Sequence, residues 1–169
     1  MTTTETKPFV PDFGDDEEDR TIAFVCSKGS LDMAYPGLIM ANGAIESGME
    51  AHLFFTFWGM DMITKKRQDH LHFSPVGNPA AHMPAALAPL PGMQTMATSM
   101  MKKQIADLGI PSVPEFIAHL SEMGAHFWAC RLSVDMFGLE REDMIDELEG
   151  ILNVSDFIEI TKDAEIMFI

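Results

Sequence analysis

The sequence predicts an α/β fold: a single compact domain of three layers, with a mainly parallel sheet and helices on both of its faces. The chain has 169 residues and 47% hydrophobic content, which is enough apolar mass for one core. Short apolar segments alternate with longer segments of helical periodicity, the order typical of a parallel sheet. Residues 51–57 are almost continuously apolar, as expected for a parallel strand that is covered on both faces.

The individual elements follow from apolar spacing and from residues that begin or end helices. Strands are expected at 21–26, 51–57, 125–130 and 165–169. Helices are expected at 30–47, 93–108, 112–123, 132–137, 142–148 and 153–162. Apolar side chains recur every three or four residues in the longer helical segments, which gives each of these one buried face. Ser112 and Glu115 form a capping box that begins one helix, and Gly124 ends it.

Two segments depart from this pattern: one precedes the domain formed by residues 21–169, and the other lies within it. Both suggest contacts with other subunits or proteins. Residues 1–20 carry seven acidic and two basic side chains, so we expect an acidic, flexible N-terminal arm. Residues 59–92 contain five prolines, too many for an uninterrupted helix, and the connection is long for a compact domain. We interpret this Pro-rich connection as a lid or as an arm that reaches a neighbouring subunit, and we expect a homo-oligomer.

The charge and composition exclude several classes of function. A formal net charge of −15 argues against nucleic-acid binding, which needs a clustered basic surface, and against docking on anionic membranes. No apolar run approaches the roughly 20 residues that a membrane span needs. The N-terminus lacks the pattern of a signal peptide, and two cysteines do not make a disulfide scaffold, so we expect the protein to be located in the cytoplasm. No dinucleotide-binding or P-loop motif is present, so no cofactor is expected.

Both cysteines occur where a predicted strand ends. In open α/β folds, ligands bind beyond the carboxyl ends of the strands, and a thiol near the start of the next helix is favoured as thiolate. Cys130 is followed directly by Arg131 and a predicted helix, which strengthens this expectation. The signal at Cys26 is weaker, although Lys28 lies nearby, because loop residues 27–30 separate it from the next helix. Cysteine also fills cores as a small hydrophobe, so both interpretations stay open.

A thiolate at Cys130 suits sulfur chemistry. It would attack a sulfane sulfur, become a persulfide and pass the terminal sulfur to an acceptor thiol. Arg131 and the N–H groups of the following helix would stabilise the anion, and Ser133 would donate a hydrogen bond. Lys28, Trp58 and Gly59 complete the predicted site, with Trp58 sheltering the persulfide. Cys26 would be a second catalytic thiol, although no C-x-x-C motif supports a thioredoxin-like pair.

Two further clusters have weaker functional interpretations. His70, His72 and His82 lie in the Pro-rich connection, but their spacing matches no closed zinc pattern, so no metal site is predicted. The alternative is an oxidoreductase that uses a metal on this arm. The basic run 65–67 is either a solvated face or a docking point for an acidic partner or an anionic sulfur donor such as thiosulfate.

Residues 129–139, with the sequence Cys-Arg-Leu-Ser-Val-Asp at 130–135, resemble the DsrE/DsrF-like sulfurtransferase family. The similarity is greatest to the branch called DsrE2-like, which is sometimes labelled "peroxiredoxin family". Further matching segments lie at 41–44, 54–60 and 157–169. The peroxiredoxin label finds no support, because the peroxidatic motif of Pro and Thr ahead of Cys is absent. Cys130 matches the sulfur-carrying cysteine of the branch, whereas many relatives lack a thiol at the position of Cys26.

The resemblance implies a parallel α/β fold, homo-oligomeric assembly and a persulfide-carrying role in intracellular sulfur trafficking or sulfur oxidation. It also implies partners such as TusA-type sulfur carriers and rhodaneses. A second hypothesis is a non-catalytic subunit that binds a TusA-type carrier without holding sulfur itself. The acidic arm at 1–20 and the connection at 59–92 both suit contacts with a partner.

Overall fold

A five-stranded parallel sheet forms the centre of the computed structural model, which describes residues 20–73 and 90–169. The strand order is β4-β3-β2-β1-β5, and every strand pairs in parallel with its neighbours. The strands are β1 (Thr21–Cys26), β2 (Glu50–Phe55), β3 (His126–Cys130), β4 (Gly150–Leu152) and β5 (Glu165–Phe168). The predicted α/β class with a mainly parallel sheet is therefore confirmed.

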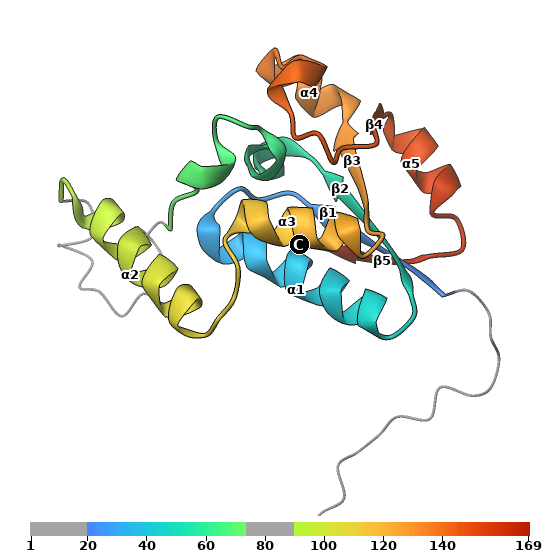
Figure 1. Ribbon diagram of the computed structural model, residues 1–169. Coiled ribbons are helices and arrows are strands. Elements are labelled where there is room, and N and C mark those ends of the chain that lie inside the picture. The colour runs from blue at the N-terminus through green and yellow to red at the C-terminus, as the bar shows by residue number, and fades with distance from the viewer. Residues whose placement is uncertain (1–19, 74–89) are drawn as a thin grey trace, which may run out of the picture.

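The helices lie on both sides of the sheet (Figure 1). The α-helices are α1 (Leu31–Glu46), α2 (Met93–Asp107), α3 (Val113–Glu122), α4 (Arg131–Phe137) and α5 (Val154–Ile160). Within residues 20–73 and 90–169, the 3₁₀ helices are η1 (Phe57–Ile63), η2 (Gln68–His70) and η4 (Arg141–Asp143). In Figure 1, α1 and α3 pack side by side against the sheet, whereas α2 lies at the far left of the molecule. Among the described helices, none is long and apolar enough to cross a membrane.

The sheet has two cores of unequal size, one on each face. The larger core packs Phe24, Leu53 and Phe127 from the strands against α1 and α3. The smaller core, on the other face, contains Phe54 and Phe157, whose rings stack with centroids 4.3 Å apart. Side chains alternate between the faces along a strand, so consecutive strand residues belong to different cores.

Two segments differ from the sequence prediction by more than a shift at an end, each for a local reason. The second strand ends at Phe55, because Phe57 has φ 47° and opens η1 instead of continuing the strand. The helix predicted at 142–148 is a loop around η4, followed by β4. The Arg141 guanidinium donates hydrogen bonds to the carbonyls of Ile145 and Leu148, which holds this segment as a loop.

Two predictions fall largely outside the described residues. The acidic arm at 1–20 is described only at Arg20, and residues 74–89 of the Pro-rich connection, with His82, are not described. The Pro-rich connection begins at Gly59, and its described part contains most of η1 and all of η2. The flexible arm and the lid or intersubunit arm therefore stay predictions.

Candidate functional site

Cys130 occupies the junction between a strand and a helix that the sequence predicted. It is the last residue of β3 and the N-cap residue of α4, and it is only 3% exposed. Burial raises the pKa of its thiol. Hydrogen bonds from the Ser133 backbone, the Thr56 and Ser133 side chains and the Leu132 backbone outweigh burial, so the net pKa is below its ordinary value. The surroundings of Cys130 therefore favour a thiolate at a position almost closed to solvent.

The neighbouring hydroxyls of Thr56 and Ser133 form a buried network beside this sulfur. Ser133 Oγ accepts a hydrogen bond from the Phe57 backbone N–H at 2.8 Å and lies 3.1 Å from Thr56 Oγ1. Phe57 has the positive φ of 47°, a conformation that costs a non-glycine residue of order 1–3 kcal/mol. This conformation directs the Phe57 N–H to the Ser133 hydroxyl oxygen. The Ser133 hydroxyl proton therefore remains available to donate a hydrogen bond to another group.

Sequence reasoning identified Ser133 but missed Thr56. Ser133 is three residues after Cys130, and the structure places it in the first turn of α4. Thr56 comes from the end of β2, and it reaches Cys130 only because β2 and β3 are neighbours. Arg131 is exposed, whereas the groups that lower the pKa of Cys130 belong to Thr56, Leu132 and Ser133. The stabilising role assigned to Arg131 stays a prediction.

Cys26 lies in a different environment from Cys130. It belongs to the larger core under α1, and burial raises the pKa of its thiol to about 12. Its strand partner is Phe55, which in turn pairs with Ala129. Ala129 therefore lies two strands away, roughly 10 Å at the usual strand spacing. Cys130, the next residue, faces the opposite side of the sheet.

The separation of the two thiols has a chemical consequence. A disulfide needs Cα atoms within about 7 Å and side chains directed toward one another, so this arrangement does not form a redox pair. A thiol whose pKa is about 12 also remains protonated near neutral pH. The expectation of a reactive thiolate at Cys26 is not supported by its surroundings.

Gly59 acts through close contact between two loops. A Cβ atom on Gly59 would lie 2.1 Å from the Cys26 carbonyl oxygen, and one on Gly29 would lie 2.1 Å from the Trp58 carbonyl oxygen. The Thr56 backbone N–H donates to the same Cys26 carbonyl at 3.0 Å. Glycine at both positions therefore lets the loops after β1 and β2 lie in close contact, which holds the backbone of Thr56 against the end of β1.

A pocket of about 520 Å³ lies at this carboxyl edge of the sheet. Its lining residues are Lys28, Gly29, Ser30, Trp58, Asp61, Lys66, Arg67, His70, Leu71, His72 and Gln94. The structure thus brings Lys28 and Trp58 together, while Cys130 and Ser133 are not in the lining. Trp58 is 62% exposed, and its ring contacts that of Phe137, the last residue of α4, with centroids 5.3 Å apart.

The basic run 65–67 pairs with acidic side chains. Lys65 Nζ lies 2.6 Å from Asp146, Lys66 Nζ lies 4.0 Å from Asp143, and Arg67 lies 2.8 Å from Asp61. The two lysine pairs join the segment after η1 to the loop around η4, whereas the Arg67 pair joins it to η1 itself. Among the described residues, His70 and His72 have no third side chain close enough to complete a metal site.

Comparisons with known proteins concern almost the whole chain. Residues 18–169 match the model of the DsrE/DsrF/DrsH-like family. The chain is 34% identical over 157 residues to the sulfur carrier protein DsrE2 of Allochromatium vinosum, covering 88% of this chain and 97% of that protein. It is 24% identical over 138 residues to the uncharacterized protein YrkE of Bacillus subtilis, covering 79% and 86%.

One solved structure supports the fold. The protein of unknown function MTH1491 from Methanobacterium thermoautotrophicum superposes with a TM-score of 0.56 at 8% identity. The superposition covers 89% of this chain and 100% of that chain. At this level of identity the similarity supports the α/β architecture alone.

Proposed function

The chain belongs to the DsrE/DsrF/DrsH-like family, and from that premise we propose that it is a sulfur carrier that holds sulfur as a persulfide on Cys130. The observation that carries the proposal is the lowered pKa of a thiol surrounded by hydrogen-bond donors. A thiolate is the species that attacks sulfur. The relative of Allochromatium vinosum that is named a sulfur carrier protein supports the same role.

Loading and unloading are displacement reactions at sulfur. The Cys130 thiolate attacks the terminal sulfane sulfur of a donor, a new S–S bond forms, and the donor's own bond to that sulfur breaks with its electron pair leaving on the donor. An acceptor thiolate then attacks the outer sulfur of the persulfide and regenerates the Cys130 thiolate. The N–H groups of Leu132 and Ser133 and the hydroxyl of Thr56 stabilise the anion in both resting states.

The remaining residues of the predicted site act around this centre. Lys28 lines the carboxyl-edge pocket and attracts an anionic donor, and Arg131 supports the persulfide anion from its exposed position. Trp58 lines the pocket, contacts Phe137 of α4 and, in this proposal, shelters the sulfur from water. Gly59 keeps the two loops in contact. The protein works in the cytoplasm as a homo-oligomer and exchanges sulfur with a TusA-type carrier or a rhodanese.

A second candidate is a non-catalytic subunit that binds a TusA-type carrier. The low exposure of Cys130, at 3%, favours it, because a closed thiol is hard for a donor to reach. Exposed Leu132 and Met136 on α4 would contact the carrier. Binding of a TusA-type protein that persists unchanged in a Cys26→Ser/Cys130→Ser double variant, without sulfur loading of the wild type, would favour this alternative.

The test of the leading proposal is sulfur loading read by mass spectrometry. The protein is incubated with polysulfide or thiosulfate, and its intact mass is measured under non-reducing conditions. We expect wild type and Cys26→Ser to gain sulfur, and Cys130→Ser to gain none. The proposal fails if wild type gains no sulfur or if Cys130→Ser gains as much as wild type.

A further inference from the structure

A second group of ionisable side chains lies at the opposite edge of the sheet from Cys130. Glu50 is the first residue of β2, His52 is the third, and His126 is the first residue of β3. The strand register pairs His52 with His126, and their rings stack with centroids 4.6 Å apart. His126 is four residues before Cys130 along β3, about 13 Å at the usual rise of a strand. This cluster is therefore separate from the sulfur site.

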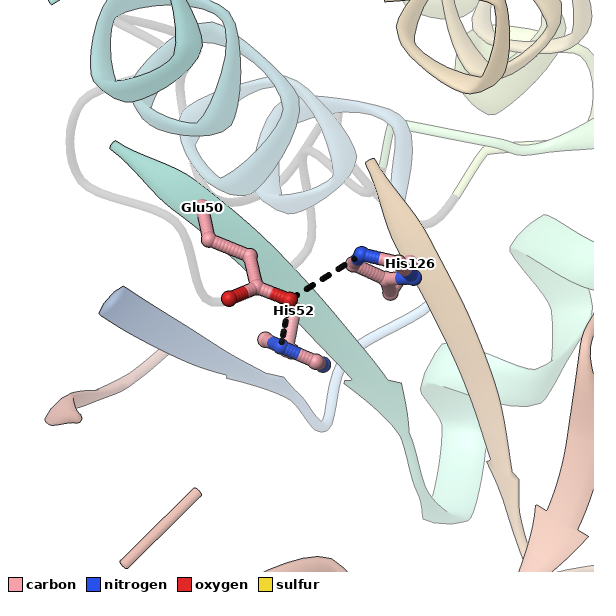
Figure 2. A group of neighbouring side chains, drawn as sticks. All are labelled: Glu50, His52 and His126. Atoms are coloured by element: carbon pink, nitrogen blue, oxygen red, sulfur yellow. Dashed lines mark hydrogen bonds and ion pairs between the residues drawn. The ribbon is translucent and has the colours of Figure 1, made fainter. Parts of the chain in front are cut away.

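The three side chains converge on one point, as Figure 2 shows. Glu50 Oε1 lies 3.2 Å from His52 Nε2 and 3.2 Å from His126 Nε2. One ligand atom from each residue lies within 4.8 Å of the other two. A tetrahedral ion with bonds of 2.0–2.1 Å to nitrogen and oxygen separates its ligands by about 3.3–3.4 Å. Two of the three ligand separations thus already fit, and the third closes when the stacked rings of His52 and His126 tilt toward each other, so that the lone pairs in their ring planes meet at the ion.

A second carboxylate, that of Glu149, orients the imidazole ring of His126. His126 Nδ1 lies 2.6 Å from Glu149 Oε1, so a proton on Nδ1 is held by that carboxylate and Nε2 faces the centre of the cluster. Histidines that bind metals usually donate their second N–H in this way, and the donated bond fixes both the tautomer and the ring orientation. Glu149 therefore positions His126 without entering the cluster itself.

We propose that Glu50, His52 and His126 form a binding site for a divalent transition-metal ion, with Zn²⁺ as the best fit. Two imidazoles and one carboxylate suit Zn²⁺ or Fe²⁺, whereas Mg²⁺ and Ca²⁺ prefer sites made only of oxygen. The side chain of Glu50 is 48% exposed and that of His126 is 33% exposed, so solvent reaches the site. Three protein ligands leave a further position on the ion for water or another ligand.

Trp128 controls whether His52 takes part. The Trp128 indole N–H donates to His52 Nδ1 at 3.1 Å, and an indole nitrogen can only donate. Nδ1 therefore carries no proton, and in the neutral ring the proton sits on Nε2 and is directed at Glu50. An ion at Nε2 displaces that proton, and Nδ1 takes one up in its place. Binding of the ion thus breaks the hydrogen bond from the Trp128 N–H to His52 Nδ1, and the His52 ring stays neutral.

This competition predicts an unusual result for Trp128→Phe. The variant keeps an aromatic ring beside His52 but removes the N–H that opposes the metal-bound tautomer. We expect it to bind Zn²⁺ about three- to tenfold more tightly than wild type, from the net free energy of one neutral hydrogen bond. A residue with a purely structural role would not produce tighter binding when it is truncated.

The experiment is equilibrium dialysis of the full chain, purified without a histidine tag, against Zn²⁺ with the bound metal quantified. Wild type is expected to bind one equivalent, and Glu50→Gln and His126→Gln to lose it. Glu149→Gln is expected to bind about 10–100-fold more weakly. His119→Gln, which changes an exposed histidine on α3, is the matched control and is expected to bind as wild type does. Circular dichroism reports whether each variant is folded.

Each outcome decides the proposal. Loss of one equivalent in folded Glu50→Gln and His126→Gln, with tighter binding by Trp128→Phe, supports the site. Stoichiometric binding that survives in both ligand variants, or no binding by wild type, overturns it. Unchanged affinity in Trp128→Phe removes His52 from the ligands and overturns the three-ligand site.

Discussion

The Thr56 hydroxyl offers a direct way to change the acidity of Cys130. Thr56→Val removes one hydroxyl and keeps the branched shape, while Ser133 Oγ keeps its bond from the Phe57 N–H. Because the Thr56 side chain lowers the pKa of Cys130, its loss raises that pKa. A hydrogen bond to a charged group contributes about 1.5–3 kcal/mol, and 1.36 kcal/mol corresponds to one pKa unit. Solvent and the remaining donors offset part of this, so we expect a rise of about one unit.

The assay is the rate of alkylation of the native protein by iodoacetamide as a function of pH. A Cys26→Ser background ensures that only Cys130 reacts. The matched control is Thr64→Val, which removes another buried threonine hydroxyl that bonds to the Met60 carbonyl. The pH midpoint should shift upward in Thr56→Val and stay unchanged in Thr64→Val. An unchanged midpoint in folded Thr56→Val would refute the assignment of Thr56 to the thiolate.

Three further predictions concern the surroundings of the site. The pKa of Cys26 is raised to about 12 in the folded protein, so the stability it contributes is present below its ordinary pKa of 9.0 and is lost as pH rises toward 12. The free energy of unfolding, measured in urea, should therefore fall less above pH 9 in Cys26→Ala than in wild type. An identical dependence on pH in the variant and in wild type would contradict this. Gly59→Ala should destabilise the fold by about 1–3 kcal/mol, because the new Cβ meets the Cys26 carbonyl. Gly43→Ala, on an open helical surface, is the control and should be neutral or stabilising. Equal urea midpoints for the two variants would count against the loop contact. Lys28→Gln should slow loading by thiosulfate by up to about tenfold at low salt, with a smaller effect at high salt, and an unchanged rate would remove Lys28 from donor capture.

The sequence predicted the parts of the site that are close together along the chain. Cys130 at a strand end and Ser133 three residues later follow from a short apolar run and the residues that begin the next helix. Thr56 could not be found in this way, because its contact with Cys130 depends on which strands are neighbours. The same holds for His52 and His126, which the register of β2 and β3 brings together. Their polar character within apolar strands was the available signal.

The prediction for Cys26 shows a second limit. Cys26 and Cys130 both end a predicted strand, but β1 and β3 present their last residues to opposite faces of the sheet. Cys26 packs beneath α1, where a Cβ on Gly37 would lie 3.1 Å from its sulfur, and no helix begins directly after it. β4 was missed for another reason, since three residues are too few to show a periodic pattern.

Sulfur transfer in a single turnover tests the carrier role most directly. The protein is loaded with polysulfide, separated from the excess, and mixed with a thiol acceptor such as glutathione, and peptide mass spectrometry follows the Cys130 and Cys26 peptides over time. We expect the extra sulfur on the Cys130 peptide to disappear as glutathione persulfide forms, with no sulfur on the Cys26 peptide. Sulfur found on Cys26 instead, or a Cys130 persulfide that no acceptor removes until the protein is unfolded, would contradict the account.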